Sequence, residues 1–250
     1  MSHFSDNFHS AKKNAEFYDT FWQSFTDEIF SDEKKRVKAI IRLMKIFSTN
    51  KNNTNILDSG CGRGWMAPFL SQYGKYTGVD FSDEGIKYAK LRHGHLGDFF
   101  LLNDMNVIPN SWISKSNIIV SSEVIEHLHY HDDYIKELTS YLAHDGILIL
   151  TTPNGNLWSV YSEYMHSTGN YMQPIENWIT PAQLKELLVK NNYSILEHNG
   201  IRDRNFFVGN LLRDNLLYKI IEYINGRIKS FHQRSLVVGL YQIICARKIS

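Results

Sequence analysis

Short apolar runs alternate with longer helical patterns between residues 55 and 151, and this alternation limits the possible folds more than any other feature of the sequence. Strands that consist almost wholly of apolar residues, and that alternate with helices, are typical of a parallel sheet covered on both faces. The alternation therefore predicts an α/β fold with a doubly wound core. The predicted strands are Asn55–Asp58, Tyr76–Asp80, Phe99–Leu102, Asn117–Ser121 and Ile147–Thr151, and the predicted helices between them are Trp65–Tyr73, Glu84–Arg92 and Asp132–Ala143.

Two flanking regions complete the chain. Before the alternating region, an aromatic cluster precedes a predicted helix that begins at Ser31 and ends near Phe47. After it, Thr180 is the expected N-cap of a helix over Pro181–Lys190, with proline at the first helical position. We predict late strands at Tyr193–Glu197 and Leu236–Arg247, a helical cap over residues 1–50, and one domain over residues 51–250 with cap insertions at about 155–179 and 203–235.

The overall charge does not favour nucleic acid as a partner. The formal net charge is +1 at pH 7, so nucleic-acid binding would need a local basic patch. The two cysteines, Cys61 and Cys245, are far apart, and the N-terminus lacks the pattern of a signal peptide. No apolar run reaches the ~18–20 residues that cross a bilayer. We expect a cytoplasmic protein without a transmembrane segment, as a monomer or a homodimer.

The end of the first core strand carries the most informative motif, Asp58-Ser59-Gly60-Cys61-Gly62-Arg63-Gly64. Glycines let the backbone turn tightly and approach a ligand, and the start of the following helix presents unpaired N–H groups. The spacing Gly-x-Gly-x-Gly differs from the Gly-x-Gly-x-x-Gly that holds a dinucleotide pyrophosphate. The motif therefore indicates a ligand-binding loop and disfavours an NAD-binding oxidoreductase.

Acidic residues follow the next two predicted strands. Asp80 ends the second strand, where a carboxylate can accept hydrogen bonds from both hydroxyls of a ribose. Asp104 and Met105 follow the third strand, where an acid can accept from an adenine amino group while an apolar side chain covers the ring. The three loops together indicate a ligand that contains adenosine.

From about Asn55 to Asn154 these motifs follow the order of class I S-adenosylmethionine (SAM)-dependent methyltransferases, and the chain resembles that family. The resemblance implies a Rossmann-like sheet of seven strands, mostly parallel with an antiparallel last strand, and a helical, aromatic cap. It also implies SAM as cofactor and S-adenosylhomocysteine (SAH) as product. The cofactor-binding residues implied in this way are Asp58, Gly60, Cys61, Gly62, Gly64, Asp80, Phe81, Asp104, Met105 and Ser121.

Candidates for the chemistry follow the fourth predicted strand. Glu126 and His127 are neighbours there, and Glu123 shares a face with His127 if a helical turn begins at this point. His127 can act as the base that deprotonates a hydroxyl, with Glu126 beside it. Two carboxylates and an imidazole can instead hold a divalent cation. We favour His127 as the base, and the alternatives are a metal held by these three residues or a purely structural role as helix caps.

The Glu-x-x-Glu-His string resembles the corresponding loop of ubiquinone-biosynthesis O-methyltransferases and of small-RNA 3′-terminal 2′-O-methyltransferases. The second resemblance implies metal ligands together with a further downstream histidine. Here the chain departs from the RNA enzymes, because no Arg-His-x-x-His pattern follows Asn154 and His166 is the only histidine before Thr180. We expect O-methylation of a hydroxyl on a small molecule or glycan. The alternatives are an RNA 3′-terminal 2′-O-methyltransferase and a SAM-binding regulatory protein without turnover.

In this type of family, N-terminal helices and the insertion after the fifth strand form a lid over the acceptor. Both regions are rich in aromatic residues, which suit flat rings and the apolar faces of sugars. We predict that Tyr18, Trp22 and Tyr164 bind the substrate. The segment from Asn205 to Phe231 has apolar residues at helical spacing, and it could extend the cap, pair two subunits or rest on a membrane surface.

Overall fold

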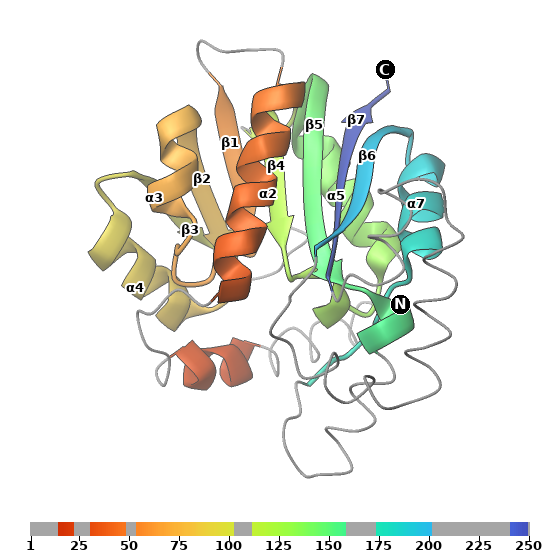
Figure 1. Cartoon of the computed structure of the whole chain (residues 1–250). Helices are drawn as coiled ribbons and strands as arrows, with labels where there is room; N and C mark the ends of the chain where they lie inside the picture. Colours follow the sequence, from red (N-terminus) through yellow and green to blue (C-terminus); the bar gives the residue numbers. More distant parts are fainter. Residues whose placement is uncertain are drawn as a thin grey trace, which may run out of the picture.

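A seven-stranded sheet of order β3-β2-β1-β4-β5-β7-β6 forms the centre of the molecule in a computed structural model (Figure 1). The structure describes residues 15–22, 31–48, 54–102, 112–158, 174–201 and 241–249. Neighbouring strands are parallel except at β7, which is antiparallel to both β5 and β6. The strands are β1 Asn55–Ser59, β2 Lys75–Asp80, β3 Gly97–Leu101, β4 Ser116–Ser122, β5 Leu142–Pro153, β6 Tyr193–Ile201 and β7 Tyr241–Lys248.

The register of the parallel strands brings three loops to one edge of the sheet. Ser59, at the end of β1, pairs with Val79 of β2 on one side and with Ser121 of β4 on the other. The residues that follow β1, β2 and β4 therefore emerge next to one another. Such a carboxyl edge is where ligands bind in open α/β sheets.

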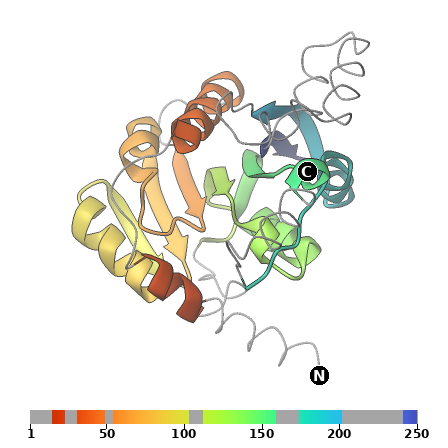
Figure 2. The ribbon, with the colours of Figure 1, turned by 60° about the horizontal axis from the view of Figure 1, so that its bottom comes forward.

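Helices cover both faces of the sheet (Figure 2). Alternation along β1 separates two cores, because Ile56 packs against α2, α3 and α4 whereas Leu57 packs against α5 and α7. The predicted doubly wound fold, with its antiparallel last strand, is confirmed. The helices are α2 Ser31–Phe47, α3 Ala67–Leu70, α4 Asp83–His93, α5 His131–Tyr141 and α7 Pro181–Lys190.

Helix α2 packs directly on the sheet, although it lies within the segment 1–50 that we predict to be a cap. Its side chains Ile40, Leu43 and Met44 are buried in the same core as Ile118 of β4. Helix α2 therefore forms part of the layer that covers the sheet. The boundary at residue 50 stays a prediction.

Some predicted element bounds are wrong. The helix predicted over Trp65–Tyr73 is shorter, because turns continue from the glycine motif to Met66, and the 3₁₀ helix η1 (Ser71–Tyr73) follows α3. Strand β5 begins at Leu142, five residues before the predicted start, because Leu142 already pairs with Ser116 of β4. The predicted insertion at 203–235, the segment from Asn205 to Phe231 and the first residues of the predicted last strand lie outside the described residues.

Among the helices in the described parts of the chain, none combines the length and apolar character that a membrane span requires.

The capping box at the start of α7 should stabilise the fold measurably. The Thr180 hydroxyl accepts a hydrogen bond from the Gln183 N–H, and the Gln183 side chain accepts one from the Thr180 N–H. We expect Thr180→Ala to lower the free energy of unfolding by about 1 kcal/mol, because a helix N–H loses its partner. Urea denaturation measures this change. Thr180→Ser keeps the hydroxyl and is the matched control, so equal stability of the two variants would contradict the prediction.

Candidate active site

The glycine motif forms a tight loop across the carboxyl edge of the sheet. Gly60, Gly62 and Gly64 have φ values of 79°, 51° and 73°, in the left-handed region that favours glycine. A Cβ atom on Gly60 would lie 2.3 Å from Val124 Cγ2, and one on Gly62 would lie 2.7 Å from Trp22 Cζ2. The loop therefore cannot accept side chains at these two positions without rearrangement.

The side chain of Asp58, in β1 just before this loop, is fully buried. Its Oδ2 atom accepts a hydrogen bond of 2.7 Å from the Tyr76 hydroxyl, whereas its Oδ1 atom has no hydrogen-bond partner. Burial raises the pKa of Asp58 to about 7, and the nearby charge of Asp80 adds to the increase. An unpartnered carboxylate oxygen in the interior is costly, so this position favours a ligand that supplies a donor.

Asp80 binds the backbone of the glycine loop through its carboxyl group. Its two carboxyl oxygens accept the N–H groups of Gly62, at 2.7 Å, and of Ser82, at 2.8 Å. Burial raises the pKa of Asp80, and these backbone hydrogen bonds oppose the increase. A carboxylate oxygen can accept more than one hydrogen bond, so Asp80 retains acceptor capacity for a ligand hydroxyl.

A helix at residues 15–22, drawn red in Figure 1, is attached to the same edge. Asp19 Oδ1 accepts hydrogen bonds from the Ser82 hydroxyl, at 2.6 Å, and from the Glu84 N–H, at 3.1 Å. Ser82 is the N-cap of α4, so the Asp19 carboxylate lies at the positive end of that helix. Sequence reasoning missed Asp19, because nothing in the local pattern pairs it with the loop after β2.

The same helix brings two predicted substrate-binding residues to the site. The ring of Tyr18 lies 5.5 Å from that of Phe81 and 5.9 Å from that of His127, measured between centroids. Trp22 packs against Gly62. Aromatic side chains therefore connect the loop after β2 with the loop after β4. Tyr164, the third predicted substrate-binding residue, lies outside the described residues.

The loop after β4 does not form the α-helical turn that would align Glu123 with His127. Glu123 has a left-handed backbone, with φ 58°, and its N–H donates to the Thr151 carbonyl at 3.0 Å. The 3₁₀ helix η3 (Ile125–His127) begins only after this turn. The Glu123 backbone thus extends the pairing with β5 by one hydrogen bond before the chain leaves the sheet.

Glu126 and His127 lie together after this turn. The buried Glu126 accepts a hydrogen bond of 2.8 Å from the Thr152 hydroxyl, and its other oxygen is 3.6 Å from His127 Nε2. His127 Nδ1 donates to the Ile175 carbonyl at 3.1 Å, since a carbonyl can only accept. Burial raises the pKa of Glu126 to about 7 and lowers that of His127. Burial therefore favours the neutral form of the ring, and the hydrogen bond from Nδ1 makes Nε2 its basic nitrogen.

Glu123 has partners of its own. Its Oε1 atom accepts a hydrogen bond of 2.9 Å from the Thr151 hydroxyl, and its Oε2 atom is 3.4 Å from Arg36 Nη1. Burial raises the pKa of Glu123 to about 7, although Arg36 opposes the increase. Arg36 comes from α2, and the sequence carries no local signal that links it to this loop.

The remaining predicted cofactor residues have different surroundings. Cys61 is buried, and burial raises the pKa of its thiol. The Ser121 hydroxyl is 2.8 Å from the Tyr134 hydroxyl, so the Ser121 side chain already has a partner within the protein. Asp104 and Met105 lie outside the described residues. In the part of the chain that the structure describes, no group of three or more His, Cys, Asp or Glu side chains could hold a metal ion.

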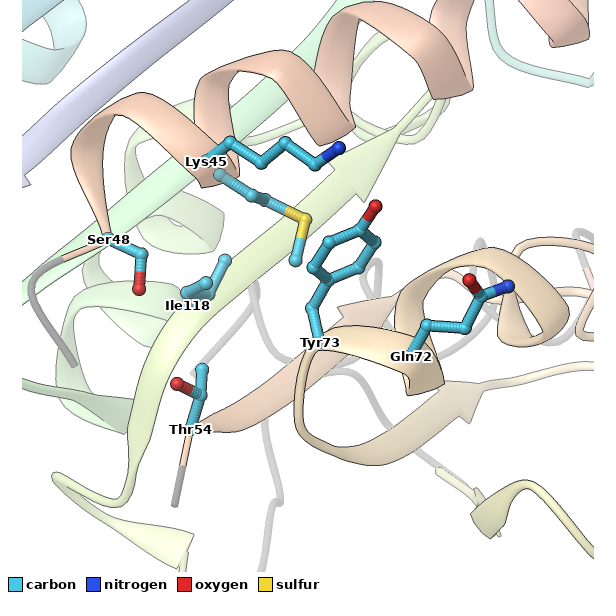
Figure 3. A pocket seen from close by; sticks show the side chains of 7 residues that line it. Lys45, Ser48, Thr54, Gln72, Tyr73 and Ile118 are labelled. Atoms are coloured by element: carbon cyan, nitrogen blue, oxygen red, sulfur yellow. The ribbon is translucent and has the colours of Figure 1, made fainter. Parts of the chain in front are cut away.

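A separate cavity of about 400 Å³ lies at the opposite, amino end of the strands (Figure 3). Lys45 and Tyr73 face each other across it, with the ammonium 5.5 Å from the ring centroid. None of the predicted site residues lines this cavity. Its lining residues are Met44, Lys45, Ser48, Thr54, Gln72, Tyr73 and Ile118.

Comparisons with known proteins match most of the chain. A family model described as a methyltransferase domain matches residues 29–198. The ubiquinone biosynthesis O-methyltransferase of Pelagibacter ubique is 30% identical over 203 residues, which cover 73% of this chain and 82% of that protein. The protein of the same name from Rickettsia typhi is 25% identical over 179 residues, which cover 66% of this chain and 70% of that protein.

A solved structure shares the fold. The magnesium protoporphyrin IX methyltransferase of Synechocystis, solved with bound SAH, superposes with a TM-score of 0.64. The alignment covers 96% of this chain and all of that one, at 13% sequence identity. At this identity the likeness concerns the fold alone.

Removal of the Asp19 carboxylate should loosen the helix at residues 15–22. Hydrogen bonds to an ionised acceptor contribute about 1.5 kcal/mol or more, so we expect amide exchange in this helix to become roughly tenfold faster in Asp19→Ala. Hydrogen–deuterium exchange followed by mass spectrometry measures the change. Asp83→Ala is the matched control, because Asp83 lies at the same end of α4 but pairs with Lys87. The same acceleration in both variants would show that Asp19 does not hold the helix.

Proposed function

The chain belongs to the methyltransferase family and is a SAM-dependent methyltransferase, and from this premise we propose that it methylates a hydroxyl group on a small aromatic molecule. The observation that carries the proposal is the position of His127 beside Tyr18, whose helix also packs against the glycine loop. A proton acceptor, an aromatic surface and the cofactor loop are thus neighbours at one edge of the sheet.

The Asp58 carboxylate supports a binding site for SAM at this edge. Its unpartnered Oδ1 atom suits the ammonium group of the methionine part of SAM. The glycine loop allows the backbone to approach that part of the ligand, and Asp80 would accept hydrogen bonds from the ribose hydroxyls. Asp104 and Met105 complete the proposed site as contacts of the adenine.

His127 would remove the proton from the acceptor. Bound SAM supplies an electrophilic methyl group, and the protein must then align the acceptor and accept its proton. The hydrogen bond from Nδ1 to the Ile175 carbonyl keeps Nε2 as the nitrogen that can take a proton. Glu126, with an oxygen 3.6 Å from Nε2, would stabilise the imidazolium that forms.

Tyr18 and Trp22 support an aromatic acceptor. Their rings lie against Phe81, His127 and Gly62, and such rings bind flat molecules through their faces and edges. The names of the relatives agree with this choice, since both act as O-methyltransferases in ubiquinone biosynthesis. A glycan hydroxyl is the second candidate, because aromatic rings also bind the apolar faces of sugars.

Neither predicted alternative function gains support from the comparisons. The relatives named above are not RNA enzymes, and a regulatory protein would not need a neutral histidine beside its ligand site. We keep the cytoplasmic location and a monomeric or homodimeric state as parts of the proposal. Both cysteines are buried and free, which fits a reducing compartment.

A methyl-transfer screen tests the proposed function. The full chain is incubated with SAM and with phenols, catechols, sugars, sugar nucleotides or short RNAs, and the release of SAH is measured. We expect turnover with one class of phenols or catechols. Turnover with RNA alone, or binding of SAH without turnover on any acceptor, would contradict the proposal.

Replacement of His127 should separate chemistry from cofactor binding. We expect His127→Gln to lower kcat by about 10²–10⁴-fold on the best acceptor from the screen, because the proton acceptor is lost. The affinity for SAH, measured by isothermal titration calorimetry, should not change. His129→Ala is the control, since His129 is exposed and two residues away. Unchanged turnover in His127→Gln would remove this residue from the mechanism.

The affinity for SAH should rise as the pH increases toward 8. The pKa of Asp58 in the ligand-free protein is about 7, and only its ionised form attracts an ammonium group. Below pH 7, each further unit of acidity should therefore weaken binding up to about tenfold. Titration calorimetry of SAH between pH 5.5 and pH 8 measures this slope. Asp58→Asn should bind weakly with a flat profile, whereas Asp98→Asn, at an exposed carboxyl of β3, should keep the wild-type slope.

A further inference from the structure

A buried arginine lies beside the acidic residues of the candidate catalytic loop. Arg36 Nη1 is 3.4 Å from Glu123 Oε2, and the two side chains are only 11% and 18% exposed. The Arg36 guanidinium also lies over the ring of Tyr241 in β7, at 5.2 Å from its centroid. Arg36 extends from α2, and its contacts with β7 and with the loop after β4 fix a permanent positive charge at this point.

Arg36 stabilises a backbone turn that is unfavourable by itself. Glu123 adopts the left-handed conformation, which costs free energy in a residue with a side chain. Two bonds to Thr151 and the contact with Arg36 hold Glu123 in this conformation. The chain after this turn carries Glu126 and His127, so Arg36 acts on the position of both.

The oxygens that a divalent metal would need already have partners. Glu123 uses one oxygen for Thr151 and the other for Arg36, and Glu126 uses one oxygen for Thr152. The charge of Glu126 also acts on Arg36. A divalent ion bound between these carboxylates would lie next to a buried guanidinium that cannot lose its charge, and the repulsion between them would be strong in this environment. The donor set therefore does not fit the metal that the resemblance to RNA enzymes implies.

We propose that Arg36 balances the negative charge of Glu123 and Glu126 and thereby excludes a divalent metal from the candidate active site. The proposal deepens the proposed function, since it makes Arg36 the positioning residue for the loop that carries His127. It concerns the binding of a cation, so it can be tested before the acceptor is known.

Direct titration of Mn²⁺ into the full chain tests this proposal, with free Mn²⁺ read by electron paramagnetic resonance. We expect no saturable binding to the wild-type protein up to 1 mM Mn²⁺. Arg36→Met has a side chain of similar length without charge, and it should bind Mn²⁺ at least tenfold more tightly than the wild type. Addition of Glu123→Gln to Arg36→Met should abolish that gain, whereas Arg36→Lys keeps a charge and should behave as the wild type.

Two results would overturn the proposal. The first is saturable Mn²⁺ binding to the wild type that Glu123→Gln removes. The second is a folded Arg36→Met variant, checked by circular dichroism, that binds Mn²⁺ no better than the wild type. If that variant does not fold, Arg36→Gln replaces it as the uncharged variant, with the same expected gain in Mn²⁺ affinity. If the wild-type protein does not bind SAH, the proposed function is contradicted, and the Mn²⁺ result is unaffected.

Discussion

The rest of the structure depends on the turn by which the chain leaves β1 and crosses the end of β2. Two successive amides, those of Gly60 and Cys61, donate to the carbonyl of Val79 at 2.9 Å each. This geometry needs a left-handed backbone at Gly60, and it brings the Gly62 N–H onto the carboxylate of Asp80. Asp58, two residues before this turn, is fully buried. One backbone turn therefore sets the geometry of the loop that we propose for the cofactor.

The site contains buried carboxyl groups whose charge the ligand-free protein compensates only in part. Burial raises the pKa of Asp58, Glu123 and Glu126 to about 7 from ordinary values near 4. The folded state thus binds these protons more tightly than the unfolded chain, so these groups lower the stability of the ligand-free protein as the pH rises from about 4 to about 7. A cation next to each carboxylate offsets that cost. Arg36 has this role at Glu123, and the ammonium group of a ligand would have it at Asp58.

Local patterns in the sequence were sufficient to predict the sheet and to select the strand-end residues that we propose for the site. Apolar runs such as Asn117–Ser121 coincide with buried strands, and a glycine or an acid at a strand end is visible without any knowledge of the fold. Other contacts at the same edge of the sheet join residues that are distant in the sequence. Asp19 and Ser82 are 63 positions apart, and no periodicity connects them. The left-handed turn at Glu123 could not be predicted either, because glutamate disfavours it locally and only Thr151 and Arg36 make it stable.

The place of β7 determines the order in which the sheet can be completed. This strand lies between β5 and β6, although it follows both in the chain and residues 202–240 separate it from β6. During synthesis on a ribosome, β6 must therefore wait without a hydrogen-bonded neighbour until Tyr241–Lys248 has left the exit tunnel. Until then the exposed edge of β5 is open to pairing with other chains. Loss of this short segment would expose one edge of β5 and separate β6 from the sheet, so the chain depends on Tyr241–Lys248 to avoid aggregation.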